Sequence, residues 1–154
     1  MCIRDRISFY LPEDKEAEAK SLRLGRDQAV REMEAEIIYS VDPLKNVGLL
    51  DILPQAATKV TALEFLRREI GLAKEKVLYA GDSGNDLLPL TAGYLAIVVK
   101  NANQDLKDKV RHRARTERVM KRIYFAQGGN RRNGNYASGI IEGLDHFGIL
   151  SEGL

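Results

Sequence analysis

The sequence predicts an α/β protein built on a parallel β-sheet, preceded by a smaller α+β unit. From Thr58 onward, strand-like and helix-like segments alternate regularly, and the strand-like segments are continuous apolar runs. Such runs are typical of parallel strands that helices bury on both faces. Before Thr58 the pattern is less regular, with short strands grouped around one long helix-favouring stretch. The change of pattern predicts two structural units.

The first unit is predicted to contain three short strands and one helical region. Runs rich in strand-favouring residues occupy residues 7–11, 36–40 and 49–54. Between the first two strands, Pro12 is predicted to open a helix, because the acidic Glu13 and Asp14 suit the positive end of its dipole. Pro43 and Gly48 predict a loop over residues 41–48.

The second unit is predicted to alternate between helices and buried strands. Its first helix covers residues 58–70, with apolar residues at helical spacing and Gly71 as its stop. Further strands are predicted at residues 76–81, 94–99 and 122–126, and further helices at residues 85–91, 104–114 and 136–147. The small residues Ala137, Ser138 and Gly139 are expected to let the last helix approach the sheet closely. Residues 126–135, rich in glycine and asparagine, predict a mobile surface loop.

Composition excludes several classes of function. The net charge is +2, from 24 basic and 22 acidic residues, which gives no electrostatic reason to expect nucleic-acid or membrane binding. The basic stretch at residues 107–122 lacks interleaved aromatic residues and is interpreted as a solvated helix face. Cys2 is the only cysteine, so a reducing, cytoplasmic location is expected. The oligomeric state is not indicated by the sequence.

The segment GDSGND, residues 81–86, follows directly after a predicted buried strand. Asp82 stands just past that strand, at the edge of a parallel sheet where ligands bind. Asn85 and Asp86 begin the next predicted helix, whose outward N–H groups favour anions. Mg²⁺ takes one or two carboxylates and leaves its other positions to water and phosphate. The pattern therefore predicts that Asp82 and Asp86 bind Mg²⁺, with Ser83 and Asn85 supporting the site.

The same residue types also occur in turns that bind nothing. Aspartate and asparagine are common in turns and helix caps, so Asp82 and Asp86 could serve only to shape the chain. The glycines fit either interpretation, because Gly81 lets the chain leave the strand and Gly84 permits a tight turn with unusual backbone angles. The complete six-residue run after an apolar strand favours the metal site.

Lys59 lies in the first turn of the helix predicted at residues 58–70. A cation near the positive end of a helix dipole is slightly unfavourable, and a local rule broken without evident gain indicates function. A fixed ammonium group beside a phosphate would neutralise its oxygens and stabilise the transferring group. Although most lysines are simply solvated, the position upstream of GDSGND favours a catalytic role for Lys59.

Lys59 and GDSGND resemble two of the four motifs of the haloacid-dehalogenase-like (HAD) phosphatases. The flanking segments ISFYLPED, IIYS, LLDILP and YASGIIEGLDHFG are most similar to sucrose-phosphate phosphatases and their relatives. The resemblance implies an incomplete HAD-like (Rossmann-like) parallel sheet with part of a small α+β cap. Residues 7–54 would then be the C-terminal part of the cap, and residues 55–150 the C-terminal part of the core.

The resemblance also implies residue roles. Asp82 would ligate Mg²⁺, Asn85 and Asp86 would hold the metal site or its waters, and Lys59 would contact the phosphoryl group and the nucleophile. The family's nucleophile is the first residue of an Asp-x-Asp motif, but none of the ten aspartates here is separated from another by one residue. We therefore expect a C-terminal fragment that binds Mg²⁺ weakly and does not turn over substrate alone. Residues 1–6 are expected to be non-native and residues 151–154 a tail.

Two functions are consistent with these motifs. The first is a Mg²⁺-dependent sugar-phosphate phosphatase that acts through an aspartyl-phosphate, with sucrose 6-phosphate as the expected substrate class and related phosphates, such as mannosylfructose phosphate, left open. The second is a non-catalytic phosphatase-like module that binds a sugar phosphate in association with a glycosyltransferase. An intact Asp-x-Asp upstream favours the enzyme, and a degenerate one favours the module. A response-regulator-like switch is disfavoured, because the acidic motif comes late in the chain.

Overall fold

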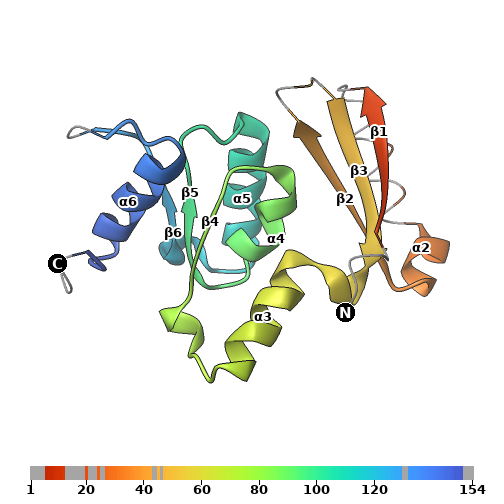
Figure 1. Cartoon of the computed structure of the whole chain (residues 1–154), viewed down its shortest axis with the longest axis horizontal. Coiled ribbons are helices and arrows are strands. Elements are labelled where there is room, and N and C mark those ends of the chain that lie inside the picture. The colour runs from red at the N-terminus through yellow and green to blue at the C-terminus, as the bar shows by residue number, and fades with distance from the viewer. Residues whose placement is uncertain are drawn as a thin grey trace. The chain divides into compact units, whose positions relative to one another are not determined.

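The computed structural model describes residues 6–12, 20, 24, 27–42, 45, 47–129 and 132–150 (Figure 1). It divides the chain into two compact units, Met1–Ala62 and Leu63–Leu154. The division falls inside helix α3 (Lys59–Glu69), somewhat later than the predicted boundary after residue 54. The assignment of the two parts to a cap and a core stays a prediction.

The first unit contains a three-stranded antiparallel sheet in the order β1-β3-β2. Its strands are β1 (Ile7–Pro12), β2 (Ala35–Asp42) and β3 (Val47–Pro54). The short helix α2 (Gln28–Glu32) precedes β2, and the 3₁₀ turn η2 (Gln55–Ala57) leads into α3. On the β1 side of the sheet, the Ser8 hydroxyl donates a hydrogen bond of 2.6 Å to the Asp51 carboxylate. The three strands predicted from the sequence are therefore confirmed.

Two local predictions in this unit are wrong. The loop expected over residues 41–48 is shorter, because β2 continues through Asp42 and β3 begins at Val47, and these two residues pair with each other. The backbone N–H of Lys45 donates to the Asp42 carboxylate at 3.3 Å and closes this short connection. Pro12 does not open a helix but ends β1, a position at which a missing N–H is tolerated. Glu13 and Asp14 lie outside the described residues.

The second unit is built on a parallel sheet in the order β4-β5-β6, which confirms the predicted α/β class. Its strands are β4 (Leu78–Gly81), β5 (Leu95–Val98) and β6 (Ile123–Phe125). The connecting α-helices are α4 (Leu87–Leu90), α5 (Gln104–Thr116) and α6 (Tyr136–His146). The 3₁₀ turns are η3 (Lys74–Lys76), η4 (Gly84–Asp86) and η5 (Met120–Arg122).

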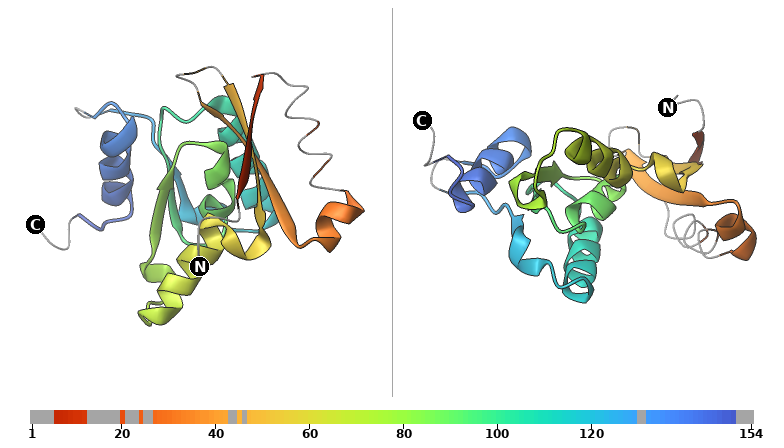
Figure 2. Two further views of the ribbon diagram at one scale, coloured as in Figure 1. Left: turned by 45° about the vertical axis from the view of Figure 1, so that its right-hand side comes forward. Right: turned by 90° about the horizontal axis from the view of Figure 1, so that it is seen from below.

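The central strand β5 is covered on both faces, as its continuous apolar sequence predicts. Ala96 and Val98 belong to a buried cluster with side chains from α4 and α5. Ile97, which alternates with them, packs against Gly143 of α6. Figure 2 shows α5 and α6 on opposite faces of this sheet. Among the described residues, no helix is long and apolar enough to cross a membrane.

Helix α3 is attached to the second unit through a charged hydrogen-bond network. Glu64 accepts a hydrogen bond from Arg67 Nε at 2.7 Å and one from the hydroxyl of Tyr94 at 2.9 Å. These donors lower the pKa of Glu64 to about 2. Burial and the bond to Glu64 raise the pKa of Tyr94 to about 12. Because Tyr94 is almost fully buried directly before β5, this contact fixes the C-terminal part of α3 against the sheet.

Glycines allow α6 to lie close to its neighbours. A Cβ atom at Gly143 would overlap the side chain of Ile97, and one at Gly139 would overlap the carbonyl oxygen of Gly134. Ser138 is half-buried, and its hydroxyl accepts a hydrogen bond from Asn133 N. At Gly139 the close approach is to Gly134 and to the side chain of Val99, directly after β5, whereas the contact with the sheet itself is made by Gly143, which was not predicted. The expectation of close approach is wrong at Ala137, which is exposed.

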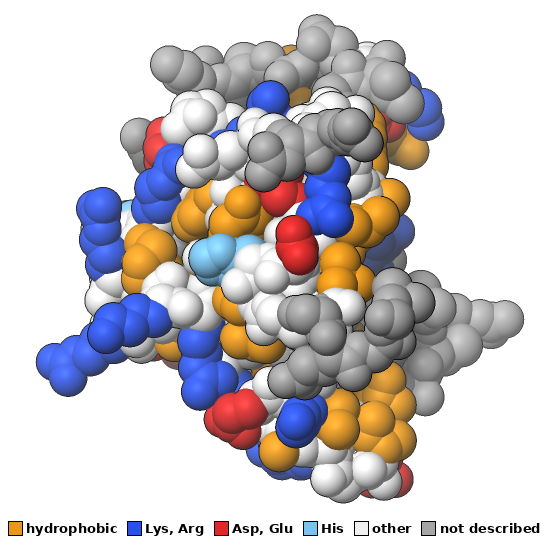
Figure 3. All heavy atoms as spheres, turned by 90° about the vertical axis from the view of Figure 1, so that its left-hand side faces the viewer, with side chains coloured by type: hydrophobic (Ala, Val, Ile, Leu, Met, Phe, Trp, Pro, Cys, Tyr) orange, Lys and Arg blue, Asp and Glu red, His pale blue; other side chains and the backbone are white. Residues whose placement is uncertain are grey.

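The side of the second unit that carries α6 faces the viewer in Figure 3. Hydrophobic, acidic and basic side chains are interspersed there among the described residues. Large hydrophobic residues that remain exposed in the α6 region are Tyr136, Ile141 and Ile149. This face therefore carries no single class of side chain.

We expect the substitution Gly139→Ala to destabilise the protein by about 1–3 kcal/mol, the usual cost of overpacking. Alanine normally favours a helix over glycine by about 1 kcal/mol, so this loss would have the opposite sign to helix propensity. Ala137→Gly in the same helix is the matched control, because Ala137 is exposed and should show only the ordinary loss. Urea unfolding measures both, and a stabilised Gly139→Ala protein would contradict the packing described.

Candidate active site

The turn after β4 is organised around the carboxylate of Asp86, which is only 4% exposed. The hydroxyl of Tyr79, within β4, donates to Oδ1 of Asp86 at 2.6 Å. The backbone N–H groups of Asp82 and Ser83 both donate to Oδ2 at 3.1 Å. A buried carboxylate requires such donors, because an unpaired charge away from water is strongly unfavourable. Asp86 therefore holds the chain in a tight turn at the end of the strand.

The two glycines of GDSGND have different roles. A Cβ atom at Gly81 would lie 2.6 Å from Cβ of Asp86 and 2.8 Å from its Oδ2, so only glycine leaves room for this carboxylate. Gly84 begins η4 and is not among the glycines with a positive φ. The predicted unusual backbone angles at Gly84 are therefore wrong, because the turn is closed by hydrogen bonds to Asp86 rather than by left-handed backbone.

The other polar residues of the motif contact the same group. The Ser83 hydroxyl lies 2.7 Å from Oδ1 of Asn85 and 3.1 Å from Oδ2 of Asp86. Burial, reinforced by the hydrogen bond to Asp86, raises the pKa of Tyr79. The structure thus brings Ser83, Asn85 and Asp86 together in one network that Tyr79 completes.

Asp82 differs from Asp86 because its side chain is exposed. Its Oδ2 accepts a hydrogen bond from Nδ2 of Asn101 at 3.1 Å. Within the described residues, its Oδ1 has no hydrogen bond or ion pair, so this oxygen is available to a hard cation. No cluster of three or more His, Cys, Asp or Glu side chains suited to a metal occurs in this part of the chain. One oriented carboxylate with an available oxygen is compatible with Mg²⁺, which leaves its other positions to water and phosphate, and the ligand role of Asp82 stays a prediction.

Asn101 was not among the residues predicted for the site. It lies three residues past the end of β5, and Asp82 lies directly after the parallel neighbour β4, so the two residues stand at the same carboxyl edge of the sheet. Its Oδ1 accepts a hydrogen bond of 2.8 Å from the backbone N–H of Tyr136, the first residue of α6. The sequence holds no clear signal for it, because Asn101 lies three residues past β5 and its two partners are 19 and 35 residues away along the chain.

Lys59 is the first residue of α3 and its side chain is exposed. The turn that begins this helix is held by Thr58 and Thr61, which exchange backbone-to-hydroxyl hydrogen bonds of 3.0 and 3.3 Å. The predicted place of Lys59 in the first turn of a helix is therefore confirmed. Because Lys59 belongs to the first unit and Asp82 to the second, their meeting at one phosphate stays a prediction.

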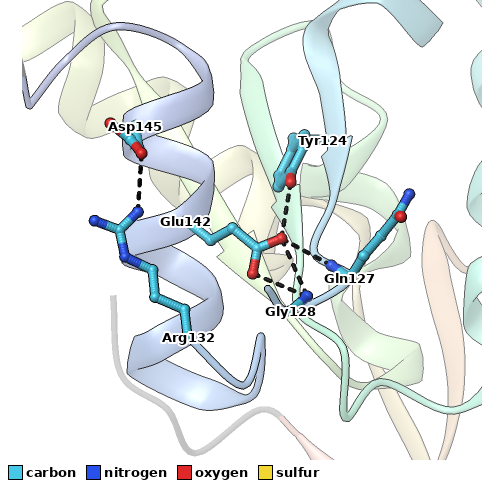
Figure 4. Close-up of polar contacts among 6 residues, drawn as sticks. All are labelled: Tyr124, Gln127, Gly128, Arg132, Glu142 and Asp145. Atoms are coloured by element: carbon cyan, nitrogen blue, oxygen red, sulfur yellow. Dashed lines mark hydrogen bonds and ion pairs between the residues drawn. The ribbon is translucent and has the colours of Figure 1, made fainter. Parts of the chain in front are cut away.

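The carboxylate of Glu142, on α6, holds the segment that follows β6 (Figure 4). Its Oε1 accepts from the Tyr124 hydroxyl at 2.8 Å and from Gln127 N at 2.9 Å, and its Oε2 accepts from Gly128 N at 3.0 Å. Further along the chain, Gly134 lies beside the end of β5, because its carbonyl accepts a hydrogen bond of 2.9 Å from Lys100 N.

The described part of the predicted mobile loop is thus tied at several points. Arg132 adds an ion pair of 3.0 Å with Asp145 on α6, a role that differs from the phosphate contact considered from the sequence. Arg131, the other arginine considered for that contact, lies outside the described residues. These contacts fix the approach of the chain to α6.

Comparison with solved structures defines the class of protein to which this fold belongs. The sucrose-phosphatase of Synechocystis sp. PCC6803, determined in complex with sucrose and phosphate, superposes with a TM-score of 0.70 at 24% identity, over 92% of this chain and 51% of that chain. A haloacid dehalogenase-like hydrolase from Bacillus subtilis superposes with a TM-score of 0.50 at 22% identity, over 90% of this chain and 44% of that chain. The fold is therefore that of the HAD-like hydrolases.

Within this class, the chain belongs to the sucrose-6F-phosphate phosphohydrolase family, which it matches over residues 4–148. A Nitrosococcus oceani protein described as a HAD-like hydrolase is 37% identical over 145 residues, 94% of this chain and 39% of that protein. Sucrose-phosphatase 1 of Nicotiana tabacum is 31% identical over 94% of this chain and 31% of its own length. Mannosylfructose-phosphate phosphatase of Agrobacterium fabrum is 29% identical over 86% and 48%, respectively. The chain thus spans about a third to a half of these relatives.

We predict that Asp86→Ala opens the turn after β4. Hydrogen bonds to a charged group contribute about 1.5–3 kcal/mol, so the amides of residues 82 and 83 should exchange with solvent at least about tenfold faster. Asp82→Ala is the matched control, because it removes a carboxylate from the same turn but leaves both amides bonded to Asp86. Amide hydrogen exchange measures the effect, and unchanged protection in Asp86→Ala would contradict the role given to this carboxylate.

A second prediction concerns pH and Glu142. Partial burial favours its neutral form, but the bonds from Gln127 N, the Tyr124 hydroxyl and Gly128 N outweigh this, so the pKa of Glu142 lies below its ordinary value of 4.5. A lowered pKa stabilises the fold above the ordinary value, and the stabilisation is lost as the pH falls through the lowered one.

Unfolding free energy should therefore decrease below about pH 4.5, and Glu142→Gln should make this decrease smaller. Glu69→Gln, on the exposed surface of α3, controls for the loss of one negative charge. Urea unfolding between pH 3 and 7 makes the comparison at about half-unit steps. Identical pH dependence in the Glu142→Gln and unsubstituted proteins would contradict the prediction.

Proposed function

We propose that this chain is the C-terminal part of a Mg²⁺-dependent sugar-phosphate phosphatase. The observation that carries the proposal is the exposed carboxylate of Asp82 at the carboxyl end of β4. Its Oδ2 accepts a hydrogen bond from Asn101, and its Oδ1 is available to a cation. Membership of the sucrose-6F-phosphate phosphohydrolase family supports it. When bound, Mg²⁺ would neutralise charge on the phosphoryl group during its transfer.

Each residue of the predicted site then has a role set by its surroundings. Asp82 supplies a ligand oxygen. Asp86, whose two oxygens already accept hydrogen bonds from Tyr79 and the turn, keeps the ligand-bearing turn in shape and would support a bound Mg²⁺ in this way. Ser83 and Asn85 complete this network. Lys59 holds the phosphoryl group by its positive charge.

The nucleophile comes from an Asp-x-Asp motif outside this sequence. Its first aspartate attacks the phosphorus, the sugar leaves as an alcohol, and water then releases phosphate from the aspartyl-phosphate. In the described sheet, β4 is an edge strand, so its free side can pair with a further parallel strand. Such a strand would end beside Asp82, where the nucleophile is required. The chain alone accordingly binds Mg²⁺ weakly and does not hydrolyse substrate.

Sucrose 6-phosphate is the proposed substrate class, from the family and from the sucrose-phosphatases among the relatives. Mannosylfructose phosphate is the second candidate, because a phosphatase for that compound is also among the relatives. The alternative from another class remains a phosphatase-like module that binds a sugar phosphate beside a glycosyltransferase, and a degenerate Asp-x-Asp upstream of this sequence would favour it.

The test joins this chain to the reading frame upstream of it in its own gene and measures phosphate release from sucrose 6-phosphate with and without Mg²⁺. We expect Mg²⁺-dependent release by the longer protein, and a loss of about 100-fold or more in kcat/KM for Lys59→Ala and Asp82→Ala. Lys45→Ala and Asp105→Ala are matched controls, since both residues are exposed and lie outside the proposed site.

The outcomes separate the hypotheses. If Lys59→Ala and Asp82→Ala both keep turnover near that of the unsubstituted protein, the site assignment is wrong. If the longer protein binds sucrose 6-phosphate but releases no phosphate, the binding module is the correct function. Release from mannosylfructose phosphate in preference to sucrose 6-phosphate would correct the substrate.

A further inference from the structure

Asn101 makes two hydrogen bonds of opposite sense from one side-chain amide. Its Nδ2 donates to Oδ2 of Asp82 at 3.1 Å, and its Oδ1 accepts from Tyr136 N at 2.8 Å. A carboxylate can only accept and a backbone N–H can only donate, so these partners determine which end of the amide faces each of them. The two ends of the asparagine amide therefore serve two different partners at once.

The backbone that Asn101 holds is strained. Tyr136 has a φ of 46°, in the left-handed region that is unfavourable for a residue with a large side chain. Such a conformation costs about 1–3 kcal/mol and persists only where the surroundings hold it in place. The bond from Asn101, together with the bond from Lys100 N to the carbonyl of Gly134, supplies that restraint. The side chain of Asn101 therefore joins Asp82 to the first residue of α6.

We propose that Asn101 is a positioning residue for the cation site: it fixes the rotamer of Asp82 so that Oδ1 is presented to the metal, and it ties that rotamer to the first residue of α6. This inference rests on the proposed function, because it takes Asp82 as a ligand. An exposed aspartate without such a partner would populate several rotamers, and ordering it would weaken binding. Partners that orient metal ligands typically change metal affinity by about 10–100-fold.

The experiment titrates Mn²⁺, as a paramagnetic substitute for Mg²⁺, into the isotope-labelled chain and follows broadening of the amide signals of residues 82–86. We expect Asn101→Ala to weaken Mn²⁺ binding by about tenfold. Asn103→Ala is the matched control: Asn103 caps α5 by accepting a bond of 2.8 Å from Leu106 N. Its loss should lower Tm but leave Mn²⁺ affinity unchanged.

A second readout needs no metal. Three-bond couplings that report χ1 of Asp82 should indicate a single rotamer in the unsubstituted chain and averaging in Asn101→Ala. Should Asn101→Ala fold poorly, Asn101→Asp serves instead, because its carboxylate can still accept from Tyr136 N but cannot donate to Asp82. We expect the Asp82 rotamer to change in Asn101→Asp as well.

Unchanged Mn²⁺ affinity and an unchanged Asp82 rotamer in the Asn101 variants would overturn this inference while leaving Asp82 as a ligand. The proposed function fails differently: Asp82→Asn would then bind Mn²⁺ as tightly as the unsubstituted chain, and the inference about Asn101 would fail with it. Weakened binding in both Asn101→Ala and Asn103→Ala would show a general effect of destabilisation and would also overturn the positioning role.

Discussion

A carboxylate removed from water must be given hydrogen-bond donors, and Asp86 obtains them from the strand and turn that precede it. Tyr79 reaches it from within β4, and the amides of Asp82 and Ser83 turn back toward it. Gly81 leaves the room for this return. The direction in which the chain leaves β4 is therefore fixed by one buried charge, and the exposed position of Asp82 is a consequence of that direction.

The geometry of the parallel sheet extends this local order to the rest of the second unit. Because β4 and β5 are parallel neighbours, Asp82 and Asn101 emerge at the same edge and can meet. Asn101 in turn contacts the first residue of α6, and Glu142 of the same helix fixes the chain that leaves β6. Hydrogen bonds and helix α6 thus connect the ends of all three strands. Asp82 supplies a carboxylate at the end of β4, and Glu142 supplies one at the end of β6.

Much of this arrangement could be predicted from the sequence, and the reasons are physical. Continuous apolar runs identified the buried strands, and the run of glycines and polar residues at the end of one of them, GDSGND, identified the turn. Asn101 was not predicted, because its importance arises from a contact with Tyr136, 35 residues away. The pairing of Glu142 with the backbone after β6 was missed for the same reason, since a backbone donor has no signature in sequence. Gly84 was misread because the identity of a glycine does not say whether its φ is positive.

Three carboxylates of the second unit, those of Asp82, Asp86 and Glu142, differ in how many of their oxygens already accept hydrogen bonds from the chain, and this difference assigns their roles. Both oxygens of Asp86 and both oxygens of Glu142 accept hydrogen bonds from the chain, so these two carboxylates stabilise the backbone around them. Asp82 uses one oxygen on Asn101 and keeps the other exposed. A divalent cation gains most from a carboxylate that is oriented but not yet neutralised. Of the aspartates in GDSGND, Asp82 alone meets both conditions among the described residues, so the site is best understood as one presented ligand supported by a rigid, charge-satisfied turn.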